Sequence, residues 1–188
     1  PYFRAPHIYM ALAARFMKGK QVITDEEAHR LRILEKYKSD CSDPVLLTTR
    51  GGSWYDRTFM ESLIRPGPDP MHWTSRTNYP VLGVHQTGPT EMSIYLFEGY
   101  AQPAARIRRY VLRLDGFASL RASWQGGETL TKPFTFEGNT LLLNYACSAT
   151  GEIHVEMTDE TGSPLPGFAM ADSSPLYGNR IDAPVPWK

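Results

Sequence analysis

Short runs of β-forming residues, separated by glycine and proline turns, constrain the fold of this chain more than any other feature. The 188 residues include fifteen glycines and fifteen prolines, and 12% of the residues are aromatic. Frequent turn residues leave little room for long helices, whereas antiparallel hairpins require them. The sequence therefore predicts an all-β fold built from short strands.

In the first part of the chain, the predicted strands come in neighbouring pairs. The expected strands are residues 7–15, 45–50 with 54–60, 80–86 with 92–98, and 107–114. Gly51-Gly52 supplies the positive φ that a tight hairpin turn needs, and Thr87-Gly88-Pro89 separates the next pair. Repeated local hairpins are typical of a β-propeller, in which each blade is a four-stranded antiparallel sheet.

One helix is expected between these strands. Thr24-Asp25-Glu26-Glu27 has the pattern of a capping box, in which Thr24 and Glu27 each bind the backbone amide of the other. Ala28, Leu31 and Leu34 then recur at helical spacing. The pattern predicts one amphipathic helix over about residues 24–39.

The character of the sequence changes near Asp115-Gly116. Short runs at residues 129–136, 140–145, 152–158 and 167–170 follow, joined by regular turns. Such spacing is typical of a β-sandwich. We therefore expect residues 1–116 to form the last blades of a partial propeller and residues 117–188 to form a β-sandwich.

Charge and cysteine content narrow the classes of partner. Twenty basic and twenty acidic residues cancel, which argues against a nucleic-acid partner. The basic run at residues 106–109 alternates with apolar residues and is interpreted as the solvated face of a strand.

Cys41 and Cys147 have neither paired nor ligand-like spacing, so no metal site and no cofactor are expected. No apolar run approaches the roughly 20 residues of a membrane span.

Several motifs together resemble those of one glycosidase group. Phe3-Arg4-Ala5-Pro6-His7-Ile8-Tyr9 resembles the E-A/G-P-H-I-Y strand of the five-bladed β-propeller glycosidases, the fructosidase and arabinosidase/xylosidase group. The run at residues 50–57 is similar to their blade hairpins. The segments at residues 58–60, 64–67, 75–80 and 110–117 resemble a little-characterised bacterial branch of glycosyl hydrolases.

The resemblance implies a propeller followed by an accessory sandwich, a carbohydrate partner, and a secreted or periplasmic location. It also places the early blades upstream of residue 1, so we expect an incomplete protein. Catalytic members of the group use three carboxylates, and the general acid is the Glu of the E-A/G-P-H strand. Arg4 stands at that position here, and a guanidinium cannot donate a proton at neutral pH.

Arg4 has two open interpretations. Its planar fork suits a uronate, a sulfate or two sugar hydroxyls, and it equally suits a structural pair with a buried carboxylate. In a regular strand, His7 would face the side opposite to Arg4. It is interpreted as a hydrogen-bonded structural residue or a binding residue.

Three further binding candidates lie just before the strand at residues 80–86. Arg76 and Asn78 have the same parity and could both face a ligand on the propeller rim, although a turn network between blades is the alternative. Trp73 could stack on a sugar ring or cover the edge of a core.

The main candidates for catalytic carboxylates are Glu98, at the end of the strand 92–98, and Asp56, which follows an aromatic hairpin strand. Glu61 and Glu91 are further candidates. Two carboxylates held ~5–10 Å apart have the geometry for glycoside hydrolysis. The leading hypothesis is part of a glycoside hydrolase whose carboxylates come mostly from upstream blades. The alternatives are a non-catalytic carbohydrate-binding propeller and a structural or interaction fragment.

Overall fold

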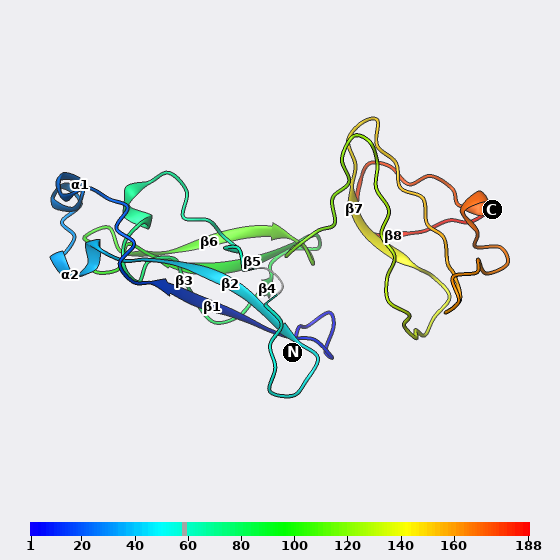
Figure 1. The fold of residues 1–188 in the computed structure, drawn as a ribbon, viewed down its shortest axis with the longest axis horizontal. Coiled ribbons are helices and arrows are strands. Elements are labelled where there is room, and N and C mark those ends of the chain that lie inside the picture. The colour runs from blue at the N-terminus through cyan, green and yellow to red at the C-terminus, as the bar shows by residue number, and fades with distance from the viewer. Residues whose placement is uncertain (58–59) are drawn as a thin grey trace. The chain divides into compact units, whose positions relative to one another are not determined.

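The computed structural model describes residues 1–57 and 60–188 and divides the chain into two compact units, Pro1–Phe117 and Ala118–Lys188 (Figure 1). Strands dominate the described residues, and the α-helices among them are the short α1, Asp25–Arg30, and α2, Glu35–Lys38. The predicted all-β character is therefore confirmed. No helix in the described part is long and apolar enough to cross a membrane.

The first sheet of unit 1 joins strands that are distant in sequence. β1, Tyr9–Met17, pairs antiparallel with β2, Cys41–Thr49, across the intervening residues 18–40. The expected hairpin of residues 45–50 with 54–60 is reduced to one bridge between Thr48 and Asp56. Residues 58 and 59 of that expected strand lie outside the described residues.

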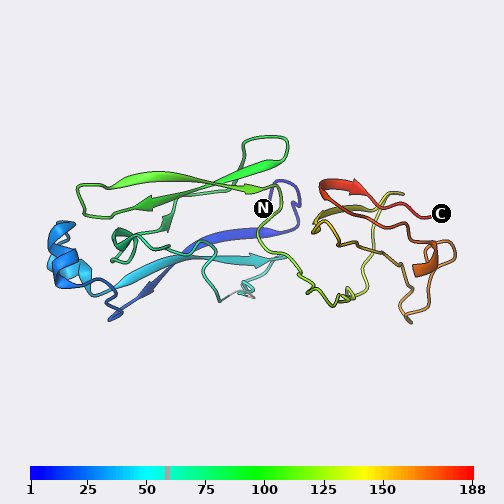
Figure 2. The same ribbon diagram turned by 90° about the horizontal axis from the view of Figure 1, so that it is seen from above.

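The second sheet of unit 1 is centred on β5, Glu91–Glu98. β6, Arg106–Arg113, pairs along one side of β5, close to the predicted bounds. β3, Tyr79–Pro80, and β4, His85–Gln86, pair along the other side. The expected strand 80–86 is thus split. Val81 N still donates to Tyr95 O of β5 at 2.8 Å, and regular pairing resumes only at His85. Figure 2 shows β5 and β6 on one side of unit 1 and β1 and β2 on the other.

The core of unit 1 follows the two-residue period of β5. Met92, Ile94 and Leu96 are each at most 1% exposed and lie on one face of the strand. Glu98 is the next residue on that same face, so the register places a carboxylate at the end of an apolar row. Strand alternation therefore directs this charged group to the buried face.

The predicted capping box is confirmed, but the single long helix is wrong. Thr24 Oγ1 accepts a hydrogen bond from Glu27 N at 3.2 Å, and Glu27 Oε2 accepts one from Thr24 N at 2.9 Å. The helix ends at Arg30, and Arg32 adopts a left-handed φ of 55° before α2 begins. Ala28 is the buried residue of α1, and Leu34 is exposed. Because so small an apolar face is buried, packing gives a longer helix little support.

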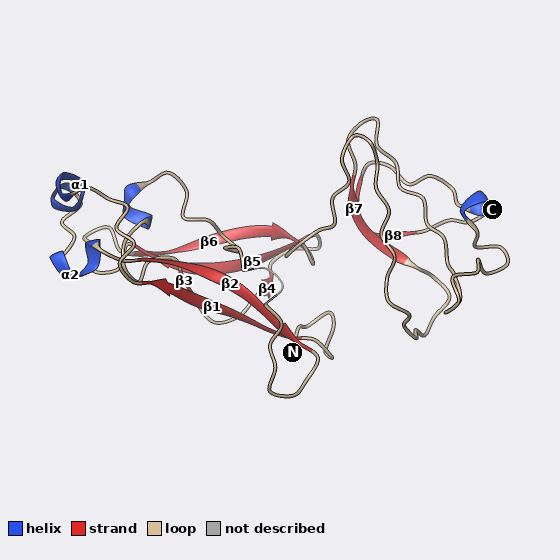
Figure 3. Ribbon diagram, viewed as in Figure 1, coloured by secondary structure: helices blue, strands red, loops and turns tan. Residues whose placement is uncertain are grey.

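Unit 2 contains one regular strand pair. β7, Leu142–Ala146, pairs antiparallel with β8, Asn179–Pro184, with a register shift between Leu143 and Tyr145. The expected strands at 129–136 and 167–170 are not strands, and 152–158 contributes only isolated bridges. Figure 3 shows these connections as loops. Leu130, Phe134 and Phe136 alternate as a strand would, but all three are more than 60% exposed, so burial does not stabilise that conformation.

Candidate functional site

Glu98 lies at the end of β5 within a cluster of polar side chains. Its side chain is 0% exposed. Oε1 accepts a hydrogen bond from Tyr110 Oη at 2.6 Å, and Oε2 accepts one from Arg106 Nε at 3.0 Å. Arg108 Nη1 lies 3.7 Å from Oε1. We call Glu98, Arg106, Arg108, Tyr110 and His72 the Glu98 cluster.

The electrostatics of this cluster hold Glu98 ionised. Burial raises the pKa of Glu98, but the Tyr110 hydrogen bond and the charges of His72, Arg106 and Arg108 outweigh it, so the pKa lies below its ordinary value. Burial and the hydrogen bond to Glu98 raise the pKa of Tyr110 to about 12. A buried carboxylate that stays ionised and has both oxygens engaged is poorly suited to act as a general acid.

His72 belongs to this cluster but was not among the predicted site residues. It ends a 3₁₀ turn, η1, Pro70–His72, which Asp69 caps by accepting a hydrogen bond from Met71 N at 3.1 Å. Its Nδ1 lies 2.8 Å from Pro66 O, and its buried Nε2 lies 3.4 Å from Glu98 Oε2 without forming a hydrogen bond within the described part of the chain. The sequence signal was Asp69-Pro70, a helix-start pattern of cap and first-turn proline.

Asn78 fixes the loop that carries the predicted binding residues. It is 2% exposed, and its Nδ2 donates to Ser42 O at 3.0 Å and to His72 O at 2.9 Å. Thr77, also buried, accepts from Ser42 Oγ at its carbonyl and from Gly99 N at its hydroxyl, at 2.6 and 2.7 Å. Asn78 therefore makes the turn network, and it does not face the surface together with Arg76.

Arg76 is the exposed residue of this loop, flanked by buried Ser75 and Thr77. The expectation of strand parity is wrong here, because Arg76 and Asn78 both have a φ of 59°, in the left-handed region. The Arg76 guanidinium carbon lies 5.7 Å from the centre of the Tyr37 ring and 5.4 Å from that of Tyr100. Nη1 donates to Tyr100 Oη at 3.3 Å. We call Arg76, Tyr37 and Tyr100 the Arg76 surface.

Trp73 lies at the end of η1 and is partly buried. Its Nε1 donates a hydrogen bond to Gly67 O at 2.6 Å, which ties the proline-rich loop to the 3₁₀ turn. The indole is thereby held in place by the backbone rather than by a neighbouring aromatic ring.

The start of the chain forms turns instead of the expected strand entry. Ala5 N donates to Tyr2 O at 3.1 Å and Ile8 N donates to Ala5 O at 2.8 Å, so β1 begins only at Tyr9. Pro6 has no amide to offer a strand partner, which is consistent with a turn. His7 is exposed within this turn.

Arg4 pairs with a carboxylate in unit 1. Arg4 Nε lies 2.9 Å from Asp115 Oδ2, and Tyr2 Oη donates to Asp115 Oδ1 at 2.5 Å. Both charged side chains are about one-third exposed, at 32% and 31%. Arg4 thus links the turn at the start of the chain to Asp115, just after β6.

The candidate carboxylates do not come together. Asp56 is exposed and forms a β-bridge with Thr48 of β2. Ser42, six residues earlier in β2, contacts Asn78 in the loop beside the Glu98 cluster. At ~3.3 Å per residue, Thr48 lies about 20 Å along β2 from Ser42, so Asp56 bridges the end of the strand that is remote from this loop. Glu91 lies at the other end of β5 and pairs with Arg109 at 2.7 Å. Glu61 pairs with exposed Arg65 at 3.4 Å.

No family model, curated protein or solved structure matches this chain. Within residues 1–57 and 60–188, no group of three or more His, Cys, Asp or Glu side chains is placed to hold a metal ion. The function therefore has to be argued from the side chains and their geometry.

The Arg76 surface has the chemistry of a binding site. A hydrogen bond from Arg76, together with its charge and a hydrogen bond involving Tyr37, lowers the pKa of Tyr100. The rings of Tyr37 and Tyr100 meet edge to face, with centres 5.4 Å apart. Fixed aromatic rings beside a guanidinium can hold a ligand that has both an apolar face and oxygen acceptors.

Proposed function

We propose that this chain contributes a carbohydrate-binding surface, centred on Arg76, to a protein that acts on or binds glycans. The observation that carries the proposal is the conformation of Arg76. A non-glycine residue in the left-handed region is strained, and such strain persists where the surrounding structure enforces it. The buried hydrogen bonds of Thr77 and Asn78 enforce it here, and Arg76 is presented outward.

An anionic sugar is the best fit to this surface. The guanidinium fork matches a carboxylate, a sulfate or two neighbouring hydroxyls, and tyrosine rings pack against the apolar faces of sugars. Lys36 adds a second positive charge, with Nζ 5.0 Å from the centre of the Tyr37 ring. Two cations beside the same ring favour a uronate or a sulfated sugar over a neutral one.

We propose further that the two sheets of unit 1 are the last blades of a five-bladed propeller and that unit 2 is an accessory β-sandwich domain. The motif resemblance and the antiparallel sheets support this assignment. Hydrolysis stays a prediction that depends on carboxylates from upstream blades, because Glu98 is engaged by Tyr110 and Arg106. Binding is the function that the described side chains favour.

The test is a titration of the chain with uronic acid oligosaccharides and their neutral counterparts. We expect Arg76→Ala to weaken binding of the acidic oligosaccharide about tenfold or more, and Arg76→Lys to restore little, because a lysine keeps the charge without the fork. Arg30→Ala, which removes an exposed arginine from α1, is the matched control. Unchanged affinity in a folded Arg76→Ala protein would contradict the proposal.

A second assay separates binding from hydrolysis. Incubation with the same oligosaccharides should release no new reducing ends. Release that Asp56→Asn abolishes, with binding retained, would favour a glycoside hydrolase instead.

A further inference from the structure

β6 is an outer strand of the sheet centred on β5, and one of its two edges is open. It pairs with β5 along its whole length without a register shift, and no other strand of the described chain pairs with it. Leu114 N donates to Thr90 O at 2.9 Å, so the ladder with β5 uses every second residue counted back from Leu114. The N–H and C=O groups of Ile107, Arg109 and Val111 therefore point away from β5, and we call these groups the β6 edge.

The β6 edge has the form of a template for an added strand. No hydrogen bond within the described residues engages it. The carbonyl of Arg113 accepts from Gly116 N at 2.9 Å, which ends the edge in a turn. Each residue of the edge can exchange two hydrogen bonds with the residue opposite it on an antiparallel strand. Because an extended backbone presents its donors and acceptors at the same spacing, the matching occupant is an extended segment.

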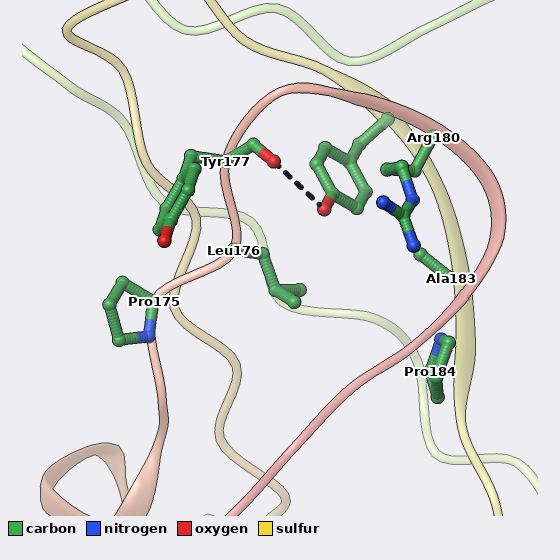
Figure 4. A pocket seen from close by; sticks show the side chains of 7 residues that line it. Pro175, Leu176, Tyr177, Arg180, Ala183 and Pro184 are labelled. Carbon is green, nitrogen blue, oxygen red and sulfur yellow. Dashed lines mark hydrogen bonds between the residues drawn. The ribbon is translucent and has the colours of Figure 1, made fainter.

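The strand pair of unit 2 is less regular. The register of β7 and β8 shifts between Leu143 and Tyr145, which interrupts the even spacing that an added strand requires. Beside this pair lies a pocket of about 220 Å³ whose lining residues bond to one another, since Tyr145 Oη donates to Tyr177 O at 3.2 Å (Figure 4). An even, open edge of this length is therefore a feature of β6.

The side chains on one face of β6 define half of the occupant. Ile107 and Val111 lie on the face opposite to the core and are 61% and 53% exposed. β-Branched apolar residues placed opposite them would cover both side chains, and such cross-strand pairs stabilise a sheet. The occupant should therefore have β-branched apolar residues on this face.

The charges on the other face define the second half. Arg106 and Arg108 have side chains that are 46% and 53% exposed, and they share the single carboxylate of Glu98. A positive charge thus remains even with both arginines at Glu98, and acidic residues opposite them would be attracted. A second copy of this chain would instead bring the four arginines of its own β6 against these, and like charges on an edge oppose pairing.

We propose that the β6 edge binds an extended segment of a partner protein, antiparallel to β6, in which acidic residues alternate with β-branched apolar ones. The apolar residues lie opposite Ile107 and Val111, and the acidic residues lie opposite Arg106 and Arg108. This surface for a protein partner rests on different residues from the Arg76 surface.

The test titrates the whole chain with a capped peptide of about eight residues in which glutamate alternates with valine, followed by NMR. We expect a dissociation constant on the order of 0.1–1 mM and slower deuterium exchange of the Ile107, Arg109 and Val111 amides. Because the valines lie opposite those residues, methylating the valine amide nitrogens should weaken binding at least about tenfold. Methylating the glutamate amide nitrogens, which point away from β6, should not.

Variants of the chain test the same geometry from the other side. Val111→Pro removes an N–H of the β6 edge without removing a ladder bond to β5, and should weaken binding about fivefold or more. Arg108→Gln should weaken binding and reduce its dependence on salt. Arg30→Ala, in exposed α1, is the matched control and should change neither. Arg76→Ala should also leave the peptide bound, which separates this proposal from the function proposed above.

Absence of binding at about 5 mM peptide would overturn the proposal, as would equal binding by the two methylated peptides. Equal affinity for a peptide of alternating lysine and valine would overturn the acidic character of the partner. Self-association of the chain that Val111→Pro abolishes would assign the β6 edge to a second copy and would likewise overturn the proposal.

Discussion

The two units use polar side chains in opposite ways. In unit 1, Glu98 is fully buried and its partners converge on it from β6 and η1. In unit 2, Asp159 Oδ1 accepts hydrogen bonds from the amides of Thr161 and Ser163 at 2.8 and 3.0 Å, in an exposed turn. Water can replace a lost partner at the exposed turn but not at the buried carboxylate. The same kinds of bond should therefore differ greatly in their effect on stability.

The sharpest test of this difference is Glu98→Ala. The change leaves the buried His72 and the Tyr110 hydroxyl without their carboxylate partner and opens a space in the core, whereas Arg106 and Arg108 are about half exposed and can be hydrated. We expect unit 1 to lose about 3 kcal/mol in its free energy of unfolding. Hydrogen exchange, which reports on each unit separately, should show unit 1 destabilised and unit 2 unchanged.

Glu91→Ala is the matched control for that experiment. Glu91 is the first residue of β5, at the opposite end of the strand from Glu98. Its ion pair with Arg109 is partly exposed, with side-chain exposures of 38% for Glu91 and 46% for Arg109. Such surface pairs contribute at most about 1 kcal/mol. Equal losses from Glu91→Ala and Glu98→Ala would show that burial does not separate the two carboxylates.

The next largest effect is expected from Asn78→Ala. The substitution leaves the buried carbonyls of Ser42 and His72 without this donor. It also places alanine, which tolerates the left-handed region less well than asparagine, at a φ of 59°. We expect a loss of about 2–3 kcal/mol in the free energy of unfolding of unit 1, measured by urea titration. Asn78→Gly keeps the backbone conformation accessible, so it should lose about 1 kcal/mol less. A more stable alanine variant would refute the assigned network.

The pH dependence of stability should also differ between the units, with a smaller effect than the substitutions above. The pKa of Glu98 is lowered in the folded state, so its contribution to stability is present above its unfolded pKa of about 4.5 and is lost as pH falls through the folded value. Tyr110 has the opposite sign, because its raised pKa stabilises the fold below pH 10 and this is lost between 10 and about 12. Glu98→Gln should flatten the acid limb of unit 1, and Tyr110→Phe should flatten the alkaline limb, in circular dichroism melts.

The smallest effect belongs to unit 2. Asp159→Ala removes the acceptor of the exposed turn, whose hydrogen bonds lower the pKa of Asp159. We expect faster exchange of the Thr161 and Ser163 amides and no measurable shift in the unfolding midpoint. A lower unfolding midpoint in the Asp159→Ala protein would contradict the expected difference between the exposed Asp159 turn and the buried Glu98 cluster.

The sequence predicted the elements whose pattern and partner are both local. The strands β5 and β6 and the capping box at Thr24 are confirmed in place. It also placed Arg106 and Tyr110 on a strand, and their shared parity could have indicated a common face. It could not identify the end of β5 as a charged cluster, because His72 reaches Glu98 from a loop 26 residues earlier in the sequence.

The failures in unit 2 have a different cause. A two-residue period says which side chains share a face, but it does not supply a neighbouring strand to pair with. Residues 129–136 have the period and are exposed, while β7 pairs with a strand more than thirty residues away. The left-handed backbone at Arg76 was equally invisible, since nothing in its residue type requires it.

That backbone places position 76 under conflicting demands. Glycine or asparagine would occupy a φ of 59° with less strain, and a relieved left-handed position is worth on the order of 1 kcal/mol. A library selected for thermal resistance should therefore enrich glycine at this position, and one selected for sugar capture should retain arginine. The trade-off between durability and activity, common at binding sites, would here be concentrated in a single codon.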